Sequence, residues 1–369
     1  MPRARDLGVP LGGRPGRFNA LSDVPGVQVG HRTLISGSPD DPTQGPVIRT
    51  GVTAIHPAGR EALYGVAGGR FVLNGMGEMT GAAFLDEYGV VYGPVLITNT
   101  VSVGTVRDAA IAWSRERSGE AGSDPSVLRG RTKPIVLETW DGVLNDVYGQ
   151  HLVAGDAWRA LDDAHGGPLD EGSVGGGTGT IAFGFKAGIG TASRMVEHRL
   201  GRFVLGALVQ ANFGRRDQLL VAGIPVGREL TTPLPTVPDQ PAGDGSIVVV
   251  LATDAPLLPS QATALAKRAS LGLGRVGSIA ASSSGDIFLA FSTANHSRYG
   301  DDALRTFHAL PTESLDPLYQ AAVETVEEAI VNALISGRAM SGNAGAFVPA
   351  LPHHELLALL ARYGRAQPD

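Results

Sequence analysis

The strongest constraint on the fold is a junction between an unpatterned segment and a continuous apolar run. Residues 231–245, TTPLPTVPDQPAGDG, are rich in proline, glycine and aspartate and follow neither a helical nor a strand period. Such a composition is typical of a linker. Residues 247–252, IVVVLA, come one residue later, and a short β-branched run after turn residues predicts a buried strand. The chain is therefore expected to contain a sheet strand directly after its clearest linker.

Strand-like and helical segments are mixed along the rest of the chain. Residues 91–100 and 286–291 are predicted to be strands. Residues 104–117 and 260–271 have helical spacing, and residues 316–337 combine a helical period with proline near the start and glycine at the end. Mixed strands with helices on the outside predict an α/β fold, specifically a four-layer αββα sandwich.

Composition limits the possible functions. The chain has 369 residues, of which 43% are hydrophobic, and its net charge is −6. That length allows one large domain or two ordinary ones, and we expect a single domain over residues 1–369. The acidic balance argues against nucleic acid or an anionic membrane as a partner. The absence of cysteine excludes disulfides, thiolate catalysis and cysteine metal sites.

No cofactor or metal site is expected. Nine histidines are present, but none lies in an H-E-x-x-H or similar set of metal ligands. Gly177, Gly179 and Ala182 give a G-x-G-x-x-A pattern, which binds dinucleotides only between a strand and a helix. Here a glycine-rich segment precedes the pattern and a strand-like run follows it, so this context is missing.

The N-terminal residues carry positive charge without an apolar core of signal-peptide length, and no uncharged apolar stretch is long enough to span a membrane. We therefore expect a cytoplasmic protein. A periplasmic or secreted form stays open, because a signal could have been removed.

Ser246 combines three features that suit catalysis. The segment before it can act as a linker, Gly245 has no side chain to shield its carbonyl, and the following strand would hold a new terminus in place. Breaking the Gly245–Ser246 bond would give Ser246 an α-amine, whose pKa of about 7.7–8.0 makes it a usable base. A serine with its own base needs no histidine. The same Gly-Ser pair is also an ordinary start of a strand, and the residues alone leave both interpretations open.

A set of motifs in a fixed order extends from about Arg3 to the C-terminal helix. Together they resemble the L-aminopeptidase/D-esterase family, which includes the D-aminopeptidase A and β-aminopeptidase enzymes. The motifs are DVPGVQVGH, NGMGEMTG, ITNTVSVGTVRDA, ETWDGVLNDV, EGSVGGGTGTIAFGFKAGIGTASR, VQANFG, GDGSIVVVLATDAPL and SGDIFLAFSTAN.

The resemblance implies an αββα sandwich like that of N-terminal nucleophile hydrolases, with different strand connectivity. It implies a precursor that cuts itself between Gly245 and Ser246 into chains 1–245 and 246–369, which stay associated. The mature protein would be a homo-oligomer, often a tetramer, and would need no metal. It would release N-terminal residues from small peptides, amino-acid amides or esters.

The resemblance also assigns roles. Ser246 matches the nucleophile and new N-terminus, Ser284 and Asp286 match a pair that assists proton transfer, and Asn212 matches an amide of the oxyanion hole. The acid of the pair is glutamate in some relatives, so Asp286 is shorter.

Two further matches concern substrate binding. Glu138 matches a carboxylate that binds the α-ammonium of the substrate. Trp140 stands where some relatives have tyrosine, and its indole N–H replaces a phenol only in part. This departure affects the expected substrate range.

Two other functions stay open at this stage. An acyltransferase resembling the ornithine acetyltransferases would share self-cleavage and a related fold, but those enzymes expose threonine where this chain has Ser246. An uncleaved binding or scaffold protein could keep the fold without activity.

Overall fold

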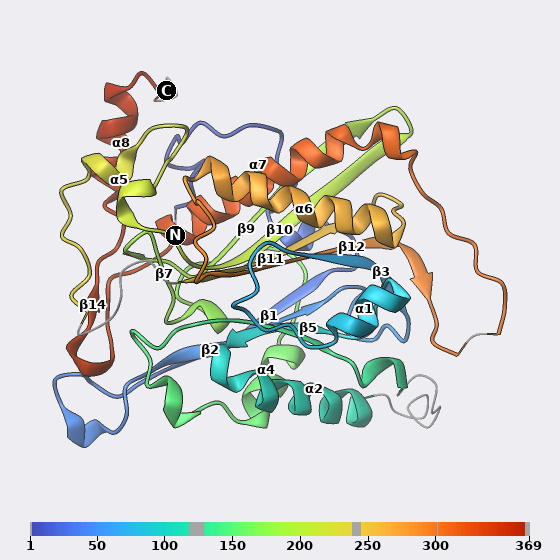
Figure 1. Cartoon of the computed structure of the whole chain (residues 1–369), viewed down its shortest axis with the longest axis horizontal. Coiled ribbons are helices and arrows are strands. Elements are labelled where there is room, and N and C mark those ends of the chain that lie inside the picture. Colours follow the sequence, from blue (N-terminus) through green and yellow to red (C-terminus); the bar gives the residue numbers. More distant parts are fainter. Residues whose placement is uncertain (1, 118–128, 238–244, 301, 366–369) are drawn as a thin grey trace.

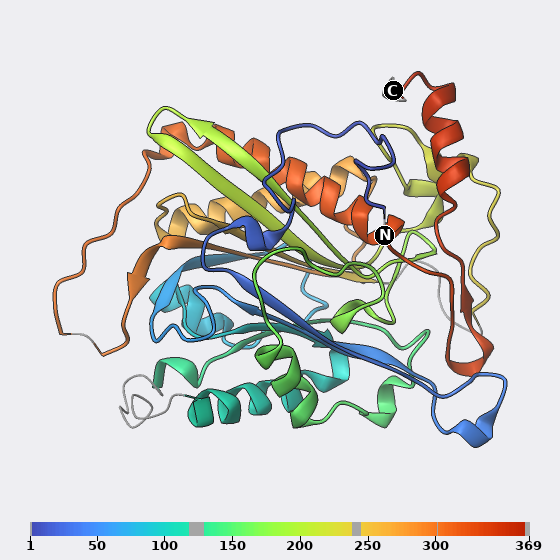
Figure 2. The same cartoon turned by 180° about the vertical axis from the view of Figure 1, so that it is seen from behind.

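The computed structural model describes residues 2–117, 129–237, 245–300 and 302–365. Within these residues, two sheets lie face to face and helices cover their outer faces (Figures 1 and 2). The four-stranded sheet has the order β1 (Gln28–Ser36), β2 (Ile48–His56), β5 (Val95–Asn99) and β6 (Ile135–Thr139). The six-stranded sheet has the order β4 (Val90–Val91), β3 (Gly65–Val72), β12 (Gly285–Ser297), β11 (Ser246–Thr253), β10 (Gly201–Asn212) and β9 (Ile189–His198).

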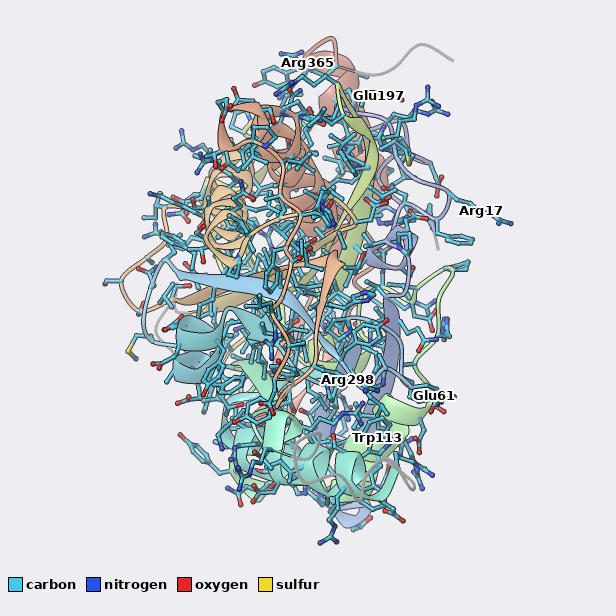
Figure 3. All side chains as sticks on the ribbon, turned by 90° about the vertical axis from the view of Figure 1, so that its right-hand side faces the viewer. Arg17, Glu61, Trp113, Glu197, Arg298 and Arg365 are labelled. Carbon is cyan, nitrogen blue, oxygen red and sulfur yellow. The ribbon has the colours of Figure 1, made fainter. Side chains whose placement is uncertain are left out.

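Helices complete the layers. α2 (Val103–Arg117) and α4 (Ala154–Asp162) pack on the four-stranded sheet, and Trp113 of α2, labelled in Figure 3, is buried in that contact. α6 (Pro259–Arg275) and α7 (Asp316–Ile335) cover the six-stranded sheet (Figure 1). The remaining described elements lie outside the layers: α1 (Ala82–Tyr88), α5 (Val226–Glu229), α8 (His353–Arg362), and the hairpins β7 (Ile181–Ala182) with β8 (Phe185–Lys186) and β13 (Met340–Ser341) with β14 (Phe347–Val348). The predicted αββα sandwich is confirmed.

The alternation of side chains in β11 explains why its sequence is apolar throughout. Val248 and Val250 belong to the hydrophobic cluster between the two sheets, whereas Ile247 and Val249 belong to the cluster under α6 and α7. A strand covered on both faces needs apolar residues at every position. Burial of each such side chain contributes about 1.5–3 kcal/mol, so the strand is firmly held within the sheet.

One predicted strand is wrong in its extent. Residues 91–100 form two strands in different sheets, since β4 pairs with β3 and β5 pairs with β2. Gly93 between them has a φ of +80°, and Pro94 follows. A left-handed glycine and a residue without an N–H donor together end the first strand and let the chain cross to the other sheet.

Other boundaries differ less. The strand predicted over 286–291 is β12, which runs on to Ser297 after an irregularity in its pairing with β3 between Ser292 and His296. The predicted helices at 260–271 and 316–337 correspond to α6 and α7. In the described part of the chain, no helix is both long and apolar enough to cross a membrane.

The proposed cut would fall inside one sheet. β11 pairs with β10 on one side and with β12 on the other, and β12 pairs in turn with β3. β3 and β10 precede Ser246 in the chain, whereas β11 and β12 follow the cut. Both expected products therefore contribute strands to the six-stranded sheet.

Candidate active site

Ser246 is the first residue of β11, and the pairing of β11 brings the other predicted residues to it. Ser246 lies opposite Asn212 at the end of antiparallel β10, and beside Gly285 at the start of parallel β12. Side chains along β11 alternate between the two faces of the sheet, and Ser246 lies on the same face as Val248. The Ser246 side chain is therefore directed to the layer between the sheets. Ser246 is buried, with 5% of its surface exposed.

The peptide bond before Ser246 is held by the sheet. The Gly285 N–H donates a hydrogen bond to the Gly245 carbonyl oxygen at 3.1 Å. A Cβ at position 245 would lie 2.1 Å from the carbonyl oxygen of Asn212, which is far inside van der Waals contact. Glycine is therefore the residue that fits at this position, and the carbonyl next to Ser246 is polarised by a backbone donor.

Ser284 and Asp286, to which the resemblance assigns proton transfer, are hydrogen-bonded to each other. The Ser284 hydroxyl donates to Asp286 Oδ1 at 2.6 Å, and both side chains are buried. Burial raises the pKa of Asp286, while hydrogen bonds from Ser284, Asn74 and the Ile247 N–H oppose the rise. Because the Ser284 proton is directed to the carboxylate, the free lone pairs of its Oγ can accept a hydrogen bond from another group.

Asn74 is a residue of this site that sequence reasoning missed. It lies just after β3, and its Nδ2 donates to Asp286 Oδ2 at 3.0 Å and to the Ala281 carbonyl at 3.2 Å. The motif NGMGEMTG contains Asn74, but that motif contributed only to the resemblance. A contact between residues 212 positions apart leaves no signal in local spacing.

The orientation of the Asn212 amide follows from its neighbour in β7. The Ile181 N–H donates to Asn212 Oδ1 at 2.9 Å. Since the oxygen is used in this way, the NH₂ group is the end of the side chain that remains for a ligand. That arrangement fits a donor to an oxyanion.

The glycine-rich segment before β7 is held by a hydrogen bond from the buried side chain of Lys186. Its first turn, Gly175–Gly177, is a 3₁₀ helix followed by β7, so the helix that a dinucleotide site requires is absent from this described segment. Lys186 is fully buried and donates from Nζ to the carbonyls of Ala187 at 2.6 Å and Gly177 at 3.3 Å. Burial lowers the pKa of Lys186 to about 7, with the buried carboxyl of Asp141 opposing the shift. Lys186 thus holds in place the segment that leads to Ile181, whose N–H donates to the Asn212 side chain.

A side chain between the sheets connects the strand of Asn212 to that of Glu138. Gln210 in β10 donates from Nε2 to the Thr98 carbonyl at 3.0 Å and to the Thr139 hydroxyl at 2.9 Å. Gln210 is two residues from Asn212, and Thr139 follows Glu138 directly. The ends of β6 and β10 therefore meet on the same side of the sandwich.

Glu138 is a buried carboxylate with neutral donors around it. The Glu78 N–H donates to Oε1 at 2.9 Å, and the Thr100 hydroxyl donates to Oε2. Burial raises the pKa of Glu138, and the Glu78 carboxylate adds to the rise, while the two hydrogen bonds oppose it. No cationic side chain of the described residues contributes to this shift, so the site is suited to a cation from outside the chain.

Trp140 lies two residues beyond Glu138 and is partly buried. Its ring meets Tyr148 edge-on at a centroid distance of 5.7 Å and lies over the backbone of Gly142. Tyr148 is 79% exposed, so this aromatic pair reaches the surface. The expected role of Trp140 in substrate binding stays a prediction.

In the described part of the chain, no three His, Asp or Glu side chains are grouped in a way that could hold a metal ion. The polar groups near Ser246 are hydroxyls, amides and single carboxylates. Their chemistry is that of acyl transfer to a serine hydroxyl.

Two relatives match this chain over nearly its whole length. The beta-peptidyl aminopeptidase BapA of Sphingosinicella microcystinivorans is 46% identical over an alignment of 378 positions, which covers 99% of this chain and 93% of the relative. The BapA of Sphingosinicella xenopeptidilytica is 44% identical, and the match covers 99% of this chain and 92% of that relative.

Solved structures agree with these relatives. A beta-aminopeptidase of Burkholderia sp. has 47% identity and a TM-score of 0.87, with 99% of this chain and 100% of that chain covered. The L-aminopeptidase D-Ala-esterase/amidase of Ochrobactrum anthropi has 43% identity and a TM-score of 0.92, with 100% of both chains covered. That structure is described as a prototype of the serine aminopeptidases and a new variant of the Ntn hydrolase fold, so this chain has the same variant fold. The model of peptidase family S58 matches residues 19–348, and the chain belongs to that family.

Proposed function

We propose that this chain is a self-processing serine aminopeptidase that forms an acyl-enzyme on Ser246. The observation that carries the proposal is the position of Ser246 at the start of a buried strand, with Asn212 opposite it and the Ser284–Asp286 pair where the next strand begins. Relatives named as aminopeptidases match almost the whole chain. They favour this function over the acyltransferase and the uncleaved scaffold.

Self-cleavage begins with attack of Ser246 Oγ on the Gly245 carbonyl carbon. A C–O bond forms and the C–N bond breaks, and the hydroxyl proton moves to the departing nitrogen. The product is an ester between Gly245 and the Ser246 oxygen, which water then hydrolyses. The hydrogen bond from the Gly285 N–H to the carbonyl oxygen supports the first step, because it stabilises negative charge on that oxygen.

Substrate hydrolysis uses the α-amine that this cut would create. The amine takes the proton of Ser246 Oγ as the oxygen attacks the substrate carbonyl, and the Asn212 NH₂ donates to the developing oxyanion. The proton then passes to the leaving amine, and Ser284 with Asp286 stabilises the ammonium form of the terminus. Water finally releases the N-terminal residue from Ser246.

Glu138 gives the reaction its preference for chain ends. Its carboxylate is buried and has no cationic partner among the described residues, so it favours a substrate ammonium, which the interior of a peptide lacks. The substrates would then be small peptides and amino-acid amides. Association of the two processed chains, their assembly into a homotetramer and a cytoplasmic location remain predictions from the sequence.

The test of this proposal combines mass and activity. Purified wild-type protein is expected to give chains of residues 1–245 and 246–369 on a denaturing gel, with the smaller one starting at Ser246. It should release p-nitroaniline from a panel of aminoacyl-p-nitroanilides in the presence of EDTA. A protein that stays uncut on prolonged incubation and releases nothing from the panel would refute the proposal.

Changing Asn212 to aspartate is expected to slow hydrolysis sharply. Asn212→Asp keeps the oxygen that accepts from the Ile181 N–H but removes the NH₂ donor. Loss of one oxyanion donor typically lowers kcat by about 10²–10³-fold. Steady-state kinetics would measure kcat and KM, and thermal unfolding would check that the fold is kept. An unchanged kcat would remove Asn212 from the oxyanion hole.

A further inference from the structure

The Asp286 carboxylate is held from two sides by residues of different segments. Ser284 donates to Oδ1, and Asn74 donates to Oδ2. Asn74 also donates to the carbonyl of Ala281, in the turn that leads to Ser284. One amide group therefore fixes both the carboxylate and the loop that carries its serine partner.

The position of Asn74 does not depend on its side chain. The Asp286 N–H donates to the Asn74 carbonyl at 3.2 Å, and the Leu73 N–H donates to the Asp286 carbonyl at 3.0 Å. Further along, Gly77 packs so closely on β12 that a Cβ at Gly285 would lie 2.6 Å from the Gly77 nitrogen. Backbone contacts thus hold this segment, and the amide of Asn74 adds a donor at one carboxylate oxygen.

The same segment reaches the second carboxylate of the site. Four residues after Asn74, the Glu78 N–H donates to Glu138 Oε1. Residues 74–78 therefore contact both Asp286 and Glu138. A change in the Asn74 side chain leaves the backbone donor at Glu138 in place.

The surroundings of Asp286 provide hydrogen-bond donors without charge. β11 contributes the Ile247 N–H, and the β3–α1 connection contributes Asn74. From α6, Lys267 reaches the ring of Phe71, which stacks beside Phe288 on the same face of β12 as Asp286. Cleavage would add an ionisable group nearby, the α-amine of Ser246, one residue from Ile247.

We propose that Asn74 is a positioning residue of the aminopeptidase reaction, whose amide keeps the Asp286 carboxylate ionised and turned toward Ser284. In this arrangement the Ser284 proton stays on the side of the carboxylate. Ser284 Oγ is then free to accept a hydrogen bond from the Ser246 terminus. The inference rests on the proposed function, since it concerns the same site.

The proposal predicts the direction of a pH effect. Asp286 must be ionised to accept from Ser284, so kcat falls as the pH drops through the pKa of Asp286. Removing a donor to a buried carboxylate raises its pKa, and a second carboxylate close by raises it further. The acid side of the kcat profile should therefore move to higher pH in Asn74→Leu, and further in Asn74→Asp.

The experiment measures kcat at saturating aminoacyl-p-nitroanilide between pH 5 and pH 9. Saturation matters, because kcat reports the substrate complex, in which Glu138 is already paired with the ammonium. The acid limb is expected to move up by about one pH unit in Asn74→Leu and by more in Asn74→Asp. Activity of both variants should recover toward that of the wild type at high pH.

A matched control uses the same substitution elsewhere on β12. Asn295 lies near the far end of the strand, where its amide donates to the carbonyls of Leu257 and His308. Asn295→Asp is expected to leave the acid limb where it is in the wild type. Asn74→Ser removes the amide without added charge or bulk, and it decides the question if the other Asn74 variants do not fold.

The outcomes separate this inference from the proposed function. A uniform loss of kcat at every pH, or an acid limb that does not move, would give Asn74 a structural role alone and overturn the inference. If the wild type cleaves no aminoacyl substrate at any pH, the proposed function itself is wrong.

Discussion

Replacement of Ser246 with alanine is expected to leave a single chain of 369 residues with no aminopeptidase activity. Alanine has no hydroxyl to attack the Gly245 carbonyl, so the bond stays intact and no α-amine forms. Both the nucleophile and the base of the reaction are lost by one substitution. Removal of a catalytic serine typically costs about 10⁶-fold in kcat, which would reduce aminoacyl-p-nitroanilide release to background.

Ser246→Ala should still fold, because it changes one small buried side chain at the first residue of β11. Intact mass spectrometry measures the chain length, and thermal unfolding measures the fold. Ser270→Ala is a suitable control, since Ser270 is partly exposed on α6 and its hydroxyl donates to the carbonyl of Lys267. That variant should be cut and active like the wild type. Cleavage before residue 246 in Ser246→Ala would show that another group attacks the bond.

The strand of Ser246 could be predicted because its signal is local. A linker composition and six apolar residues lie next to each other in the chain, and β11 forms where they meet. α7 was predictable for the same reason, since its apolar residues repeat along one continuous helix. Patterns of this kind depend only on neighbours in sequence.

Features that depend on distant contacts were not predictable. The run over residues 91–100 reads as one strand, yet its two halves belong to different sheets because their partners, β3 and β2, differ. Asn74 and Gln210 act through residues far away in the chain, at Asp286 and at Thr98 and Thr139. Pairing across a sheet carries no spacing signal, so only the fold reveals these contacts.

The burial of a charged side chain could not be predicted from the sequence either. Lys186 lies in a strand-like run that suggests an exposed cation, but it is fully buried among backbone carbonyls. Lys186 stabilises the fold by donating a hydrogen bond to the Gly177 carbonyl, in the glycine-rich segment that leads to the β7 partner of Asn212. A lysine in this position is recognised from the shape of the surrounding backbone and not from its neighbours in the chain.

Glu138→Gln is expected to lower kcat/KM for aminoacyl-p-nitroanilides by about 10²–10³-fold. The physical reason is that loss of one partner of a buried charge pair costs several kcal/mol, because the other charge is left desolvated. Here the other charge is the substrate ammonium. Glutamine keeps the size of the side chain and an oxygen that can accept from the Glu78 N–H or the Thr100 hydroxyl. Glu87→Gln, at an exposed position of α1, should behave like the wild type.

Self-cleavage distinguishes a defect in substrate binding from a damaged nucleophile. The Gly245–Ser246 bond is cut without any external ammonium, so Glu138→Gln should still yield both chains. N-acetylated substrates should be poor for the wild type and should lose little more in the variant. Equal rates on acetylated and free substrates in the wild type would show that the ammonium is not recognised.

The pH dependence of the same variant gives an independent measure of the carboxylate. Burial raises the pKa of Glu138 in the free enzyme, and protonation would remove the charge that binds the ammonium. In the wild type, kcat/KM should therefore fall as the pH drops through that raised pKa, while kcat at saturation still follows Asp286. Glutamine does not titrate, so Glu138→Gln should lose this part of the kcat/KM profile and keep the kcat profile. A variant with the wild-type shape of both profiles would place the ammonium at another group.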